Sequence, residues 1–375
     1  MGFYKIYENY KDYDVEEFFD QVDDNDVLRA LNKNRLDEKD LLTLLSPQAG
    51  KFLEPMARKA QMLTQQHFGK SILLFTPMYL SNYCTNGCVY CTYNAANHIL
   101  RKRLSMEEIA KEAKEIANTG LQHILILTGG SREITPVSYI VDAVKELKKY
   151  FSSISIEIYA LTEDEYKQVV DAGVDGFVMY QEVYDEEIYK NVHLSGEKSN
   201  YHFRMDAPER ACKAGMRTVN IGALLGLNKW RKEAFITGIH AYYLQNKYPE
   251  VDISISPPRI RPHLGVFDEV YHVDDASLLQ IMFAYRLFIP RAGITISTRE
   301  SEDFRNNVLP LGVTKMSAGV STEVGGHTTE EHQDPQFEIA DNRSVDQMRD
   351  AILERGYQPI FKDWMPLEED SLCDF

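Results

Sequence analysis

Three cysteines lie close together in the stretch NYCTNGCVYC, as Cys84, Cys88 and Cys91. Their spacing is CxxxCxxC, and the other two cysteines of the chain, Cys212 and Cys373, are far away in sequence. Four thiolates would complete a tetrahedral metal site, whereas three leave one metal position without a protein ligand. The pattern therefore predicts a metal centre with an open position.

Two kinds of metal centre fit three clustered thiols. One is a zinc site in which His98 supplies the fourth ligand, since Cys₃His sites are common. The other is an iron–sulfur cluster with one open iron, which explains the number of thiols directly. Zinc sites more often pair their ligands as CxxC at two separate places, and a catalytic nucleophile would need only one cysteine. The spacing favours the cluster.

Composition narrows the class of protein. The chain has 375 residues, with 41 Lys and Arg against 57 Asp and Glu, so its formal net charge of -16 disfavours a nucleic-acid partner. The N-terminal segment lacks the apolar core of a signal peptide, and the longest apolar runs are too short to span a bilayer. Clustered cysteines in an odd total suit a reducing compartment. We expect a cytoplasmic protein with no membrane partner.

The elements that must position the cysteines alternate between β-rich runs and helical patterns. A capping box at Ser105 and Glu108 begins one helix, and Gly120, Gly173 and Gly215 mark the ends of helices. The β-rich runs cover residues 72–81, 123–130, 154–161, 176–183, 218–227, 251–260, 294–300 and 313–321. Eight such runs, each followed by a helix, predict a (βα)₈ barrel of the TIM type rather than an open doubly wound sheet.

We place this barrel at residues 71–322. Residues 1–70 are helical and acidic in pattern, and form a helical N-terminal extension that resembles a lid or cap. Residues 323–375 form a short helical tail with one more helix, SVDQMRDAILERGY, before an acidic end. The cysteine motif directly follows the first β-rich run, where the active site of such a barrel belongs.

With Tyr90 directly before its last cysteine, the motif resembles that of the radical S-adenosylmethionine superfamily. There, three thiolates hold three irons of a [4Fe–4S] cluster, and the amine and carboxylate of S-adenosylmethionine chelate the fourth iron. The resemblance implies both cofactors here. One electron then breaks a carbon–sulfur bond and yields a 5′-deoxyadenosyl radical, which is chemistry that no side chain can do.

The same resemblance assigns residues at the strand ends to the cofactor. TGG at 128–130 occupies the place of a GGE motif that contacts the methionine amine, although Ser131 follows here. YQEVYD and HLSGEKSNYHFR resemble the stretch in which biotin-synthase-like enzymes place a Glu and an Arg on the cofactor. The residues expected to bind S-adenosylmethionine are Tyr90, Gly129, Gly130, Glu157, Glu182, Arg204 and Leu225, the last as an apolar wall for adenine. The alternatives are a simple tight turn at the glycines and a surface ion pair between Glu182 and Arg204.

Longer strings carry a narrower resemblance. MYLSNYCTNGCVYC, LTGGSRE, YQEVYDEEIY, APERACKAG, IGALLGLNKWR and GYQPIFKDW together resemble the 2-iminoacetate synthase family, the tyrosine lyases of thiazole and thiamine biosynthesis. This resemblance implies cleavage of the Cα–Cβ bond of L-tyrosine to 2-iminoacetate and p-cresol. It also implies thiazole synthase as a partner and an electron donor of the flavodoxin or ferredoxin type.

A substrate amino acid needs a clamp for its carboxylate, and the planar fork of arginine suits that task. Arg299 ends the seventh run, ITISTRE, and Ser297 lies two residues before it on the same face. Tyr79, at the end of the first run, would close the pocket from the other side. The alternative is that Arg299 pairs with Glu300 or Glu302; Arg259 and Arg261 are further candidates for the same anion.

Several rival functions remain open. A hydrogenase-maturation tyrosine lyase carries a second cysteine triad in a C-terminal extension, and here only Cys373 lies near the end. A tryptophan lyase would use the same clamp, and a biotin-synthase-like sulfur inserter would need ligands for an auxiliary cluster that Cys212 alone does not supply. A non-enzymatic metal-binding module belongs to another class. Among 22 tyrosines and 10 histidines, the pattern does not select the group that handles the phenol proton.

Overall fold

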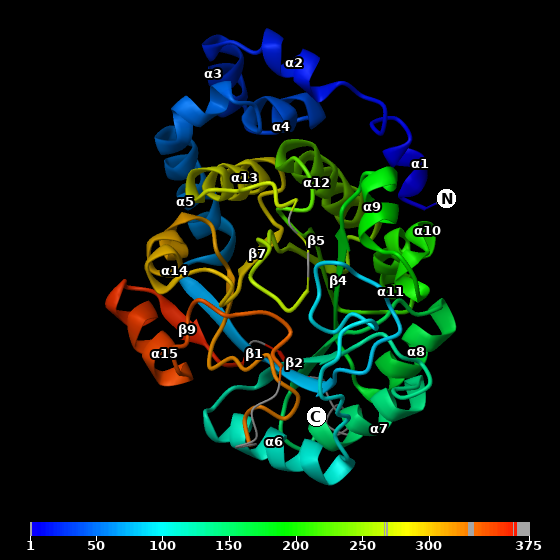
Figure 1. Cartoon of the computed structure of the whole chain (residues 1–375). Coiled ribbons are helices and arrows are strands. Elements are labelled where there is room, and N and C mark those ends of the chain that lie inside the picture. The colour runs from blue at the N-terminus through cyan, green and yellow to red at the C-terminus, as the bar shows by residue number, and fades with distance from the viewer. Residues whose placement is uncertain (1, 266, 268, 329–333, 363, 366–375) are drawn as a thin grey trace, which may run out of the picture.

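The computed structural model describes residues 2–265, 267, 269–328, 334–362 and 364–365. Its centre is a closed barrel of eight parallel strands in which β1 pairs with both β2 and β8 (Figure 1). The strands are β1 (Ser71–Ser81), β2 (His123–Thr128), β3 (Ser153–Glu157), β4 (Gly176–Glu182), β5 (Thr218–Ala223), β6 (Asp252–Ile255), β7 (Gly293–Ile296) and β8 (Lys315–Ser317). The predicted barrel and its eight strands are confirmed.

Helices surround the barrel and follow its strands in turn. They are α6 (Met106–Asn118), α7 (Val137–Leu147), α8 (Glu163–Ala172), α9 (Glu186–Val192), α10 (Tyr201–Met205), α11 (Ala207–Lys213), α12 (Trp230–Lys247), α13 (Asp275–Phe288), α14 (Glu302–Val308) and α15 (Val345–Glu354), with 3₁₀ turns η2 (Glu197–Ser199) and η3 (Leu309–Leu311). The predicted capping box at Ser105 and Glu108 begins α6. Gly173 adopts φ 119° directly after α8, a conformation that favours glycine over other residues.

Residues before the barrel form α1 (Tyr4–Tyr7), α2 (Val15–Gln21), α3 (Asp24–Asn32), α4 (Glu38–Leu44), η1 (Gln48–Phe52) and α5 (Leu53–Phe68). Helices α4 and α5 pack against α12 and α13, so this extension lies along one outer flank of the barrel (Figure 1). Among the described helices, none has the length and apolar character needed to cross a membrane.

A ninth strand, β9 (Gln358–Ile360), was not predicted. It runs parallel to the start of β1, where Ser71 is opposite Gln358, and it lies on the side of β1 that β2 occupies further along. The backbone N–H of Gln122, just before β2, donates to the carbonyl of Phe361, just after β9. The segment after the barrel therefore adds a strand beside the start of β1, next to the residues that precede β2.

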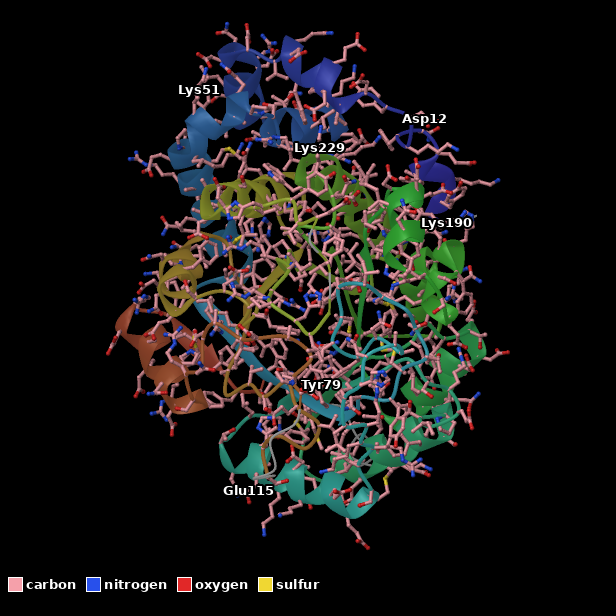
Figure 2. All side chains as sticks on the ribbon, in the orientation of Figure 1. Asp12, Lys51, Tyr79, Glu115, Lys190 and Lys229 are labelled. Atoms are coloured by element: carbon pink, nitrogen blue, oxygen red, sulfur yellow. The ribbon has the colours of Figure 1, made fainter. Side chains whose placement is uncertain are left out.

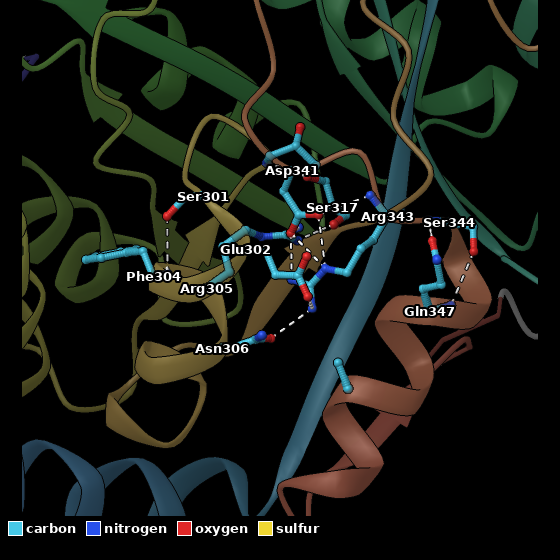
Figure 3. Close-up of polar contacts among 12 residues, drawn as sticks. Ser301, Glu302, Phe304, Arg305, Asn306, Ser317, Asp341, Arg343, Ser344 and Gln347 are labelled. Atoms are coloured by element: carbon cyan, nitrogen blue, oxygen red, sulfur yellow. Dashed lines mark hydrogen bonds and ion pairs between the residues drawn. The ribbon is translucent and has the colours of Figure 1, made fainter.

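A buried ion-pair network joins the segment before α15 to the barrel (Figure 3). The side chains of Arg305 on α14 and Asp341 are each only 1% exposed and form an ion pair. Arg343 donates to the same carboxylate, from Nη2 to Oδ2 at 2.6 Å. Arg305 also donates to the backbone carbonyl of Ser317 at the end of β8. One carboxylate thus holds two guanidinium groups at the end of β8.

We expect Asp341→Asn to lower the free energy of unfolding by about 3–5 kcal/mol, because it leaves the buried charge of Arg305 without its counter-ion. Burial alone raises the pKa of Asp341, but the hydrogen bonds from Arg343 and the charge of Arg305 outweigh it and lower the pKa to about 2. Since that pKa is lowered, the carboxylate stabilises the fold above about pH 4 and this contribution is lost as the pH falls towards 2.

Urea unfolding of the wild type and the variant at pH 7 measures this difference. Asp346→Asn is the matched control, because Asp346 pairs with Arg349 on the surface with both side chains well exposed. Its expected cost is below about 1 kcal/mol. Equal losses in the two variants would contradict a special role for the buried network.

Candidate active site

A cavity of about 220 Å³ opens at the carboxyl ends of the strands. Figure 2 shows Tyr79 inside the ring of helices, whereas Asp12, Lys51 and Glu115 lie at the periphery. None of the described residues 2–70 lines the cavity, so the N-terminal extension does not cover it as a lid. Residues of the segment after β8, including Gln336 and Phe337, line it instead.

The cavity brings together nearly all of the residues predicted for the site. Those that line it are Tyr79, Cys84, Cys88, Tyr90, Cys91, Gly129, Gly130, Glu157, Glu182, Arg204, Ser297 and Arg299. Leu225 is not among the lining residues, whereas its neighbour Leu224 is. The backbone of Leu225 bonds to Pro258 and Ile260 after β6, which fixes this residue in the wall between two strand ends.

The cysteine loop is held by hydrogen bonds to sulfur. The backbone N–H of Gly130 donates to Sγ of Cys84 at 3.3 Å, and Nδ2 of Asn86 donates to the same sulfur at 3.4 Å. Donors to sulfur are the outer contacts that tune iron–sulfur centres. Burial raises the pKa of Cys88, and raises the pKa of Cys91 to about 12. These thiols need a metal to displace their protons.

The glycines after β2 touch the same loop. A Cβ on Gly129 would lie 2.3 Å from the carbonyl oxygen of Tyr83, and one on Gly130 would lie 2.2 Å from Nδ2 of Asn86. The carbonyl of Gly130 accepts from the backbone N–H of Thr85 at 2.9 Å. Glycine is required here because the loop and the strand end approach each other so closely.

The donor set fits a cluster better than a single ion. Among the described residues, no group of three His, Cys, Asp or Glu side chains is placed to hold one metal ion. His98, the proposed fourth zinc ligand, is exposed and does not line the cavity. The three cysteines nevertheless share one cavity wall, as the ligands of a cluster must. The zinc alternative therefore lacks the fourth ligand that was proposed for it.

Tyr90 anchors the loop to the segment after α9. Its hydroxyl lies 2.6 Å from Nε2 of His193, and Cys88 forms an isolated antiparallel bridge with His193. Burial lowers the pKa of His193 well below its usual range, so its ring is neutral. The polar end of Tyr90 is thus already bonded within the protein.

Glu182 at the end of β4 lies in a charged group. Its Oε1 accepts from Nζ of Lys198 at 2.6 Å and from Nη2 of Arg204 at 3.3 Å. Both Glu182 and Arg204 are buried, so their contact is not the surface ion pair of the alternative interpretation. Glu182 is also the one described non-glycine residue with positive φ, at 73°. Such strain is characteristic of functional sites.

The clamp predicted on β7 and β1 lies in the same cavity. The guanidinium of Arg299 lies 3.5 Å from the ring centroid of Phe337, and its Nη1 donates to the carbonyl of Arg259 at 3.3 Å. Within the described ranges, Arg299 forms no ion pair, since Glu300 pairs with Arg259 and Glu302 with Arg343. Arg299 is therefore available for an anion.

Tyr79 and the neighbouring arginines complete this side. The hydroxyl of Tyr79 donates to Oε1 of Gln336 at 2.8 Å, and burial raises the pKa of Tyr79 well above its usual range. Arg259 is committed to Glu300, whereas Arg261 lines the cavity and its buried Nε has no hydrogen-bond partner. Of these two arginines, which were further candidates for binding the substrate carboxylate, only Arg261 is left available by the described contacts.

Three residues of the cavity wall that make specific polar contacts were not predicted. Lys198 belongs to η2 and lies in the stretch HLSGEKSNYHFR that was assigned to the cofactor, but only Arg204 was chosen from that stretch. Gln336 lies in an irregular segment with no periodic pattern. Asn86 lies between the first two cysteines, and its place two residues after Cys84 was a signal that could have identified it.

Comparisons with known proteins agree with this geometry. Residues 78–237 match the model of the Radical SAM superfamily, and residues 256–358 match the Biotin and Thiamin Synthesis associated domain. The 2-iminoacetate synthase of Escherichia coli (strain K12) is 37% identical over 340 residues, which cover 90% of each chain. A barrel with this cysteine triad in its cavity is a radical S-adenosylmethionine enzyme. Within that superfamily, the chain belongs to the 2-iminoacetate synthase family and is a lyase.

Solved structures give the same fold. The FeFe-hydrogenase maturase HydG from Carboxydothermus hydrogenoformans is 30% identical with a TM-score of 0.86, and the match covers 93% of this chain and 83% of that one. Methylornithine synthase (PylB), at 21% identity and a TM-score of 0.72 over 89% of this chain and 97% of that one, supports the fold alone.

Proposed function

We propose that this enzyme cleaves the Cα–Cβ bond of L-tyrosine to 2-iminoacetate and p-cresol, with 5′-deoxyadenosine and methionine formed from S-adenosylmethionine. The 2-iminoacetate would enter thiazole and thiamine biosynthesis. The observation that carries the proposal is that Arg299, an arginine free of ion pairs within the described residues, shares a cavity with three clustered thiols. A radical centre and a carboxylate clamp in one cavity suit an amino-acid substrate.

Cys84, Cys88 and Cys91 would hold the [4Fe–4S] cluster, and Glu182, Lys198 and Arg204 would hold the amino-acid end of S-adenosylmethionine. When bound, these cofactors supply a carbon radical that takes a hydrogen atom. The remaining work belongs to the protein: Gly130 and Asn86 donate to Sγ of Cys84, and Leu224 offers adenine the apolar wall that was predicted for Leu225.

On the substrate side, Arg299 and Ser297 would hold the carboxylate from β7, and Tyr79 would close the pocket from β1. Because Tyr79 stays protonated, its hydroxyl, which donates to Gln336 in this structure, would turn that proton to the substrate carboxylate. The clamp fixes the amino group near the cysteine loop that follows β1. Reacting atoms must come within about 3–3.5 Å for transfer, so this positioning decides whether the radical reaches the substrate.

The maturase family remains the nearest alternative, since its fold is so similar. The match leaves about a fifth of one HydG chain uncovered, as it covers 79% of that chain. The present sequence holds five cysteines in all, too few for a second triad beside Cys84, Cys88 and Cys91. The similarity to the 2-iminoacetate synthase of Escherichia coli over 90% of each chain supports a lyase that stops at the imine product.

Thiazole synthase is the protein partner we propose, with a flavodoxin or ferredoxin as electron donor. The imine hydrolyses in water, so direct delivery to the next enzyme would protect it. The acidic residues near Cys373 lie outside the described residues. Co-purification with thiazole synthase and a higher thiazole yield are expected, and the absence of both would contradict the partnership.

One incubation tests the reaction. The anaerobically reconstituted enzyme, with S-adenosylmethionine, a reductant and tyrosine, should release p-cresol and 5′-deoxyadenosine in matching amounts. Indole products from tryptophan, with no p-cresol from tyrosine, would replace this proposal with a tryptophan lyase. About one zinc per chain, with no iron or sulfide, would instead support a metal-binding module.

A further inference from the structure

We infer that Glu157, at the end of β3, binds the phenol hydroxyl of the substrate and so selects tyrosine over phenylalanine. This inference rests on the proposed function and assigns the far end of the substrate, which the carboxylate clamp leaves unassigned. It also gives Glu157 a different role from the cofactor contact expected from sequence.

The first observation is that Glu157 lacks a partner. Four glutamates line the cavity, and three of them form ion pairs: Glu182 with Lys198, Glu197 with Arg132, and Glu300 with Arg259. Within the part of the chain that the structure describes, the side chain of Glu157 has no hydrogen bond or ion pair. Glu157 is half-buried in the cavity wall, and a carboxyl group there without a partner is costly, so a ligand that bonds to it gains affinity.

The second observation is its position opposite the clamp. In the closed barrel, three strands separate β3 from β7 on either side: β4 to β6 in one direction, and β8, β1 and β2 in the other. Glu157 and Arg299 therefore line opposite walls of one cavity. The amino and carboxylate groups of an amino acid share one carbon and stay together near Arg299. Only the side chain can reach across to β3.

The third observation is the surface beside Glu157. It lies opposite Leu127 of β2 in the strand pairing, and both Leu127 and Tyr180 of β4 line the cavity. Ser153 and Ser155 line a second cavity at the other end of the barrel, so the two-residue period of β3 also directs Glu157 inward. The aromatic ring of a substrate that lies between Leu127 and Tyr180 would have the carboxyl group of Glu157 at its far end.

The protonation of Glu157 suits this task. Burial raises its pKa to about 7, with Glu182 adding to the effect and Arg299, Lys198 and Arg204 opposing it. A carboxyl group that is partly protonated at neutral pH can accept a hydrogen bond from a phenol or donate one to it.

Calorimetric titration of the reconstituted, S-adenosylmethionine-loaded enzyme with tyrosine and with phenylalanine tests the inference. We expect the wild type to bind tyrosine about 10- to 100-fold more tightly, as for one buried hydrogen bond to an ionisable group. In Glu157→Leu, which keeps the volume of the side chain, this ratio should fall to within about 3-fold of unity, and Glu157→Gln should restore most of it because the amide still bonds to a hydroxyl.

Glu233→Gln is the matched control, because Glu233 is a buried carboxyl group whose pKa is also raised to about 7 by burial, but it does not line the cavity. It should leave the tyrosine-to-phenylalanine ratio unchanged. Equal losses for both amino acids in Glu157→Leu, or weaker binding of S-adenosylmethionine, would overturn the inference. If Glu157→Leu does not fold, Glu157→Met replaces it, because methionine has a similar length and no hydrogen-bonding group of comparable strength: a ratio near unity supports the inference and an unchanged ratio overturns it.

The two proposals fail in different ways. If the wild type releases p-cresol from tyrosine and the ratio is the same in wild type and Glu157→Leu, only the role of Glu157 is wrong. If the wild type forms no p-cresol from tyrosine, the proposed function fails and the inference fails with it.

Discussion

Cys88→Ala is expected to abolish cleavage of S-adenosylmethionine and to leave little iron bound after anaerobic reconstitution. Cys88 is buried in the wall of the cavity, between the other two thiols in sequence, and its loss leaves two ligands where three are needed. The loss of activity should exceed the roughly 10- to 100-fold cost of removing an outer-shell contact to a metal site. Iron and sulfide analysis, with assay of 5′-deoxyadenosine, measures both effects.

Cys212→Ala is the matched control for this experiment. Cys212 is also a buried free cysteine, but it lies on α11 and does not line the cavity. We expect it to retain the iron content and the cleavage activity of the wild type. A Cys88→Ala variant with full iron content and normal 5′-deoxyadenosine production would show that the motif is not the cluster site.

Arg299→Ala is expected to separate cofactor cleavage from tyrosine cleavage. Removing one partner of a buried charge pair costs about 2–5 kcal/mol, so kcat/KM for tyrosine should fall by about 30- to 4,000-fold. Because Arg299 lies three residues after the end of β7 and contacts none of the three cysteines or Glu182 in the described contacts, 5′-deoxyadenosine should still form. The ratio of p-cresol to 5′-deoxyadenosine is therefore the decisive measurement.

Arg299→Lys tests whether the fork or only the charge is needed. Lysine keeps the charge but offers a point-like donor instead of two parallel ones, so partial recovery is expected. If Arg299→Ala instead stopped S-adenosylmethionine cleavage and left the coupling ratio of any residual turnover unchanged, Arg299 would belong to the cofactor side of the cavity.

The strands could be predicted from sequence, and the run 72–81 ends with β1 at Ser81, whereas the carboxyl ends of other strands could not be predicted. The predicted run 251–260 ends as a strand at Ile255, and the run 294–300 ends at Ile296. Beyond these points Ser256 and Ser297 line the cavity. A hydrophobic pattern reports extended backbone but not whether it still pairs with a neighbour. The residues by which the predicted runs exceed the observed strands are therefore residues that belong to the site.

The difference between Leu224 and Leu225 could have been predicted by counting along the strand. Thr218 and Asn220 of β5 line the second cavity, so the two-residue period, continued past Ala223, directs Leu224 inward. Leu225 was expected from the resemblance to related enzymes, and the alternation of this strand would have corrected that choice.

Strand β9 escaped prediction for a different reason. It is three residues long and contains Pro359, which usually argues against a strand. Its only strand partner is the start of β1, so its conformation depends on a segment near the other end of the sequence. The role of Lys198 also depends on a distant residue, because it is defined by the ion pair with Glu182, which lies 16 residues away in sequence.

The pairing of β1 with β8 and β9 also affects how this protein folds during its synthesis on the ribosome. Residues 71–75 of β1 take all their strand partners from β8 and β9, which emerge long after β1 itself. Until then, this part of β1, SILLF, is an unsatisfied sheet edge that can join another nascent chain. Slow translation would prolong that exposure, so we expect recombinant yield to depend on chaperone supply and growth temperature more than on the stability of the finished barrel.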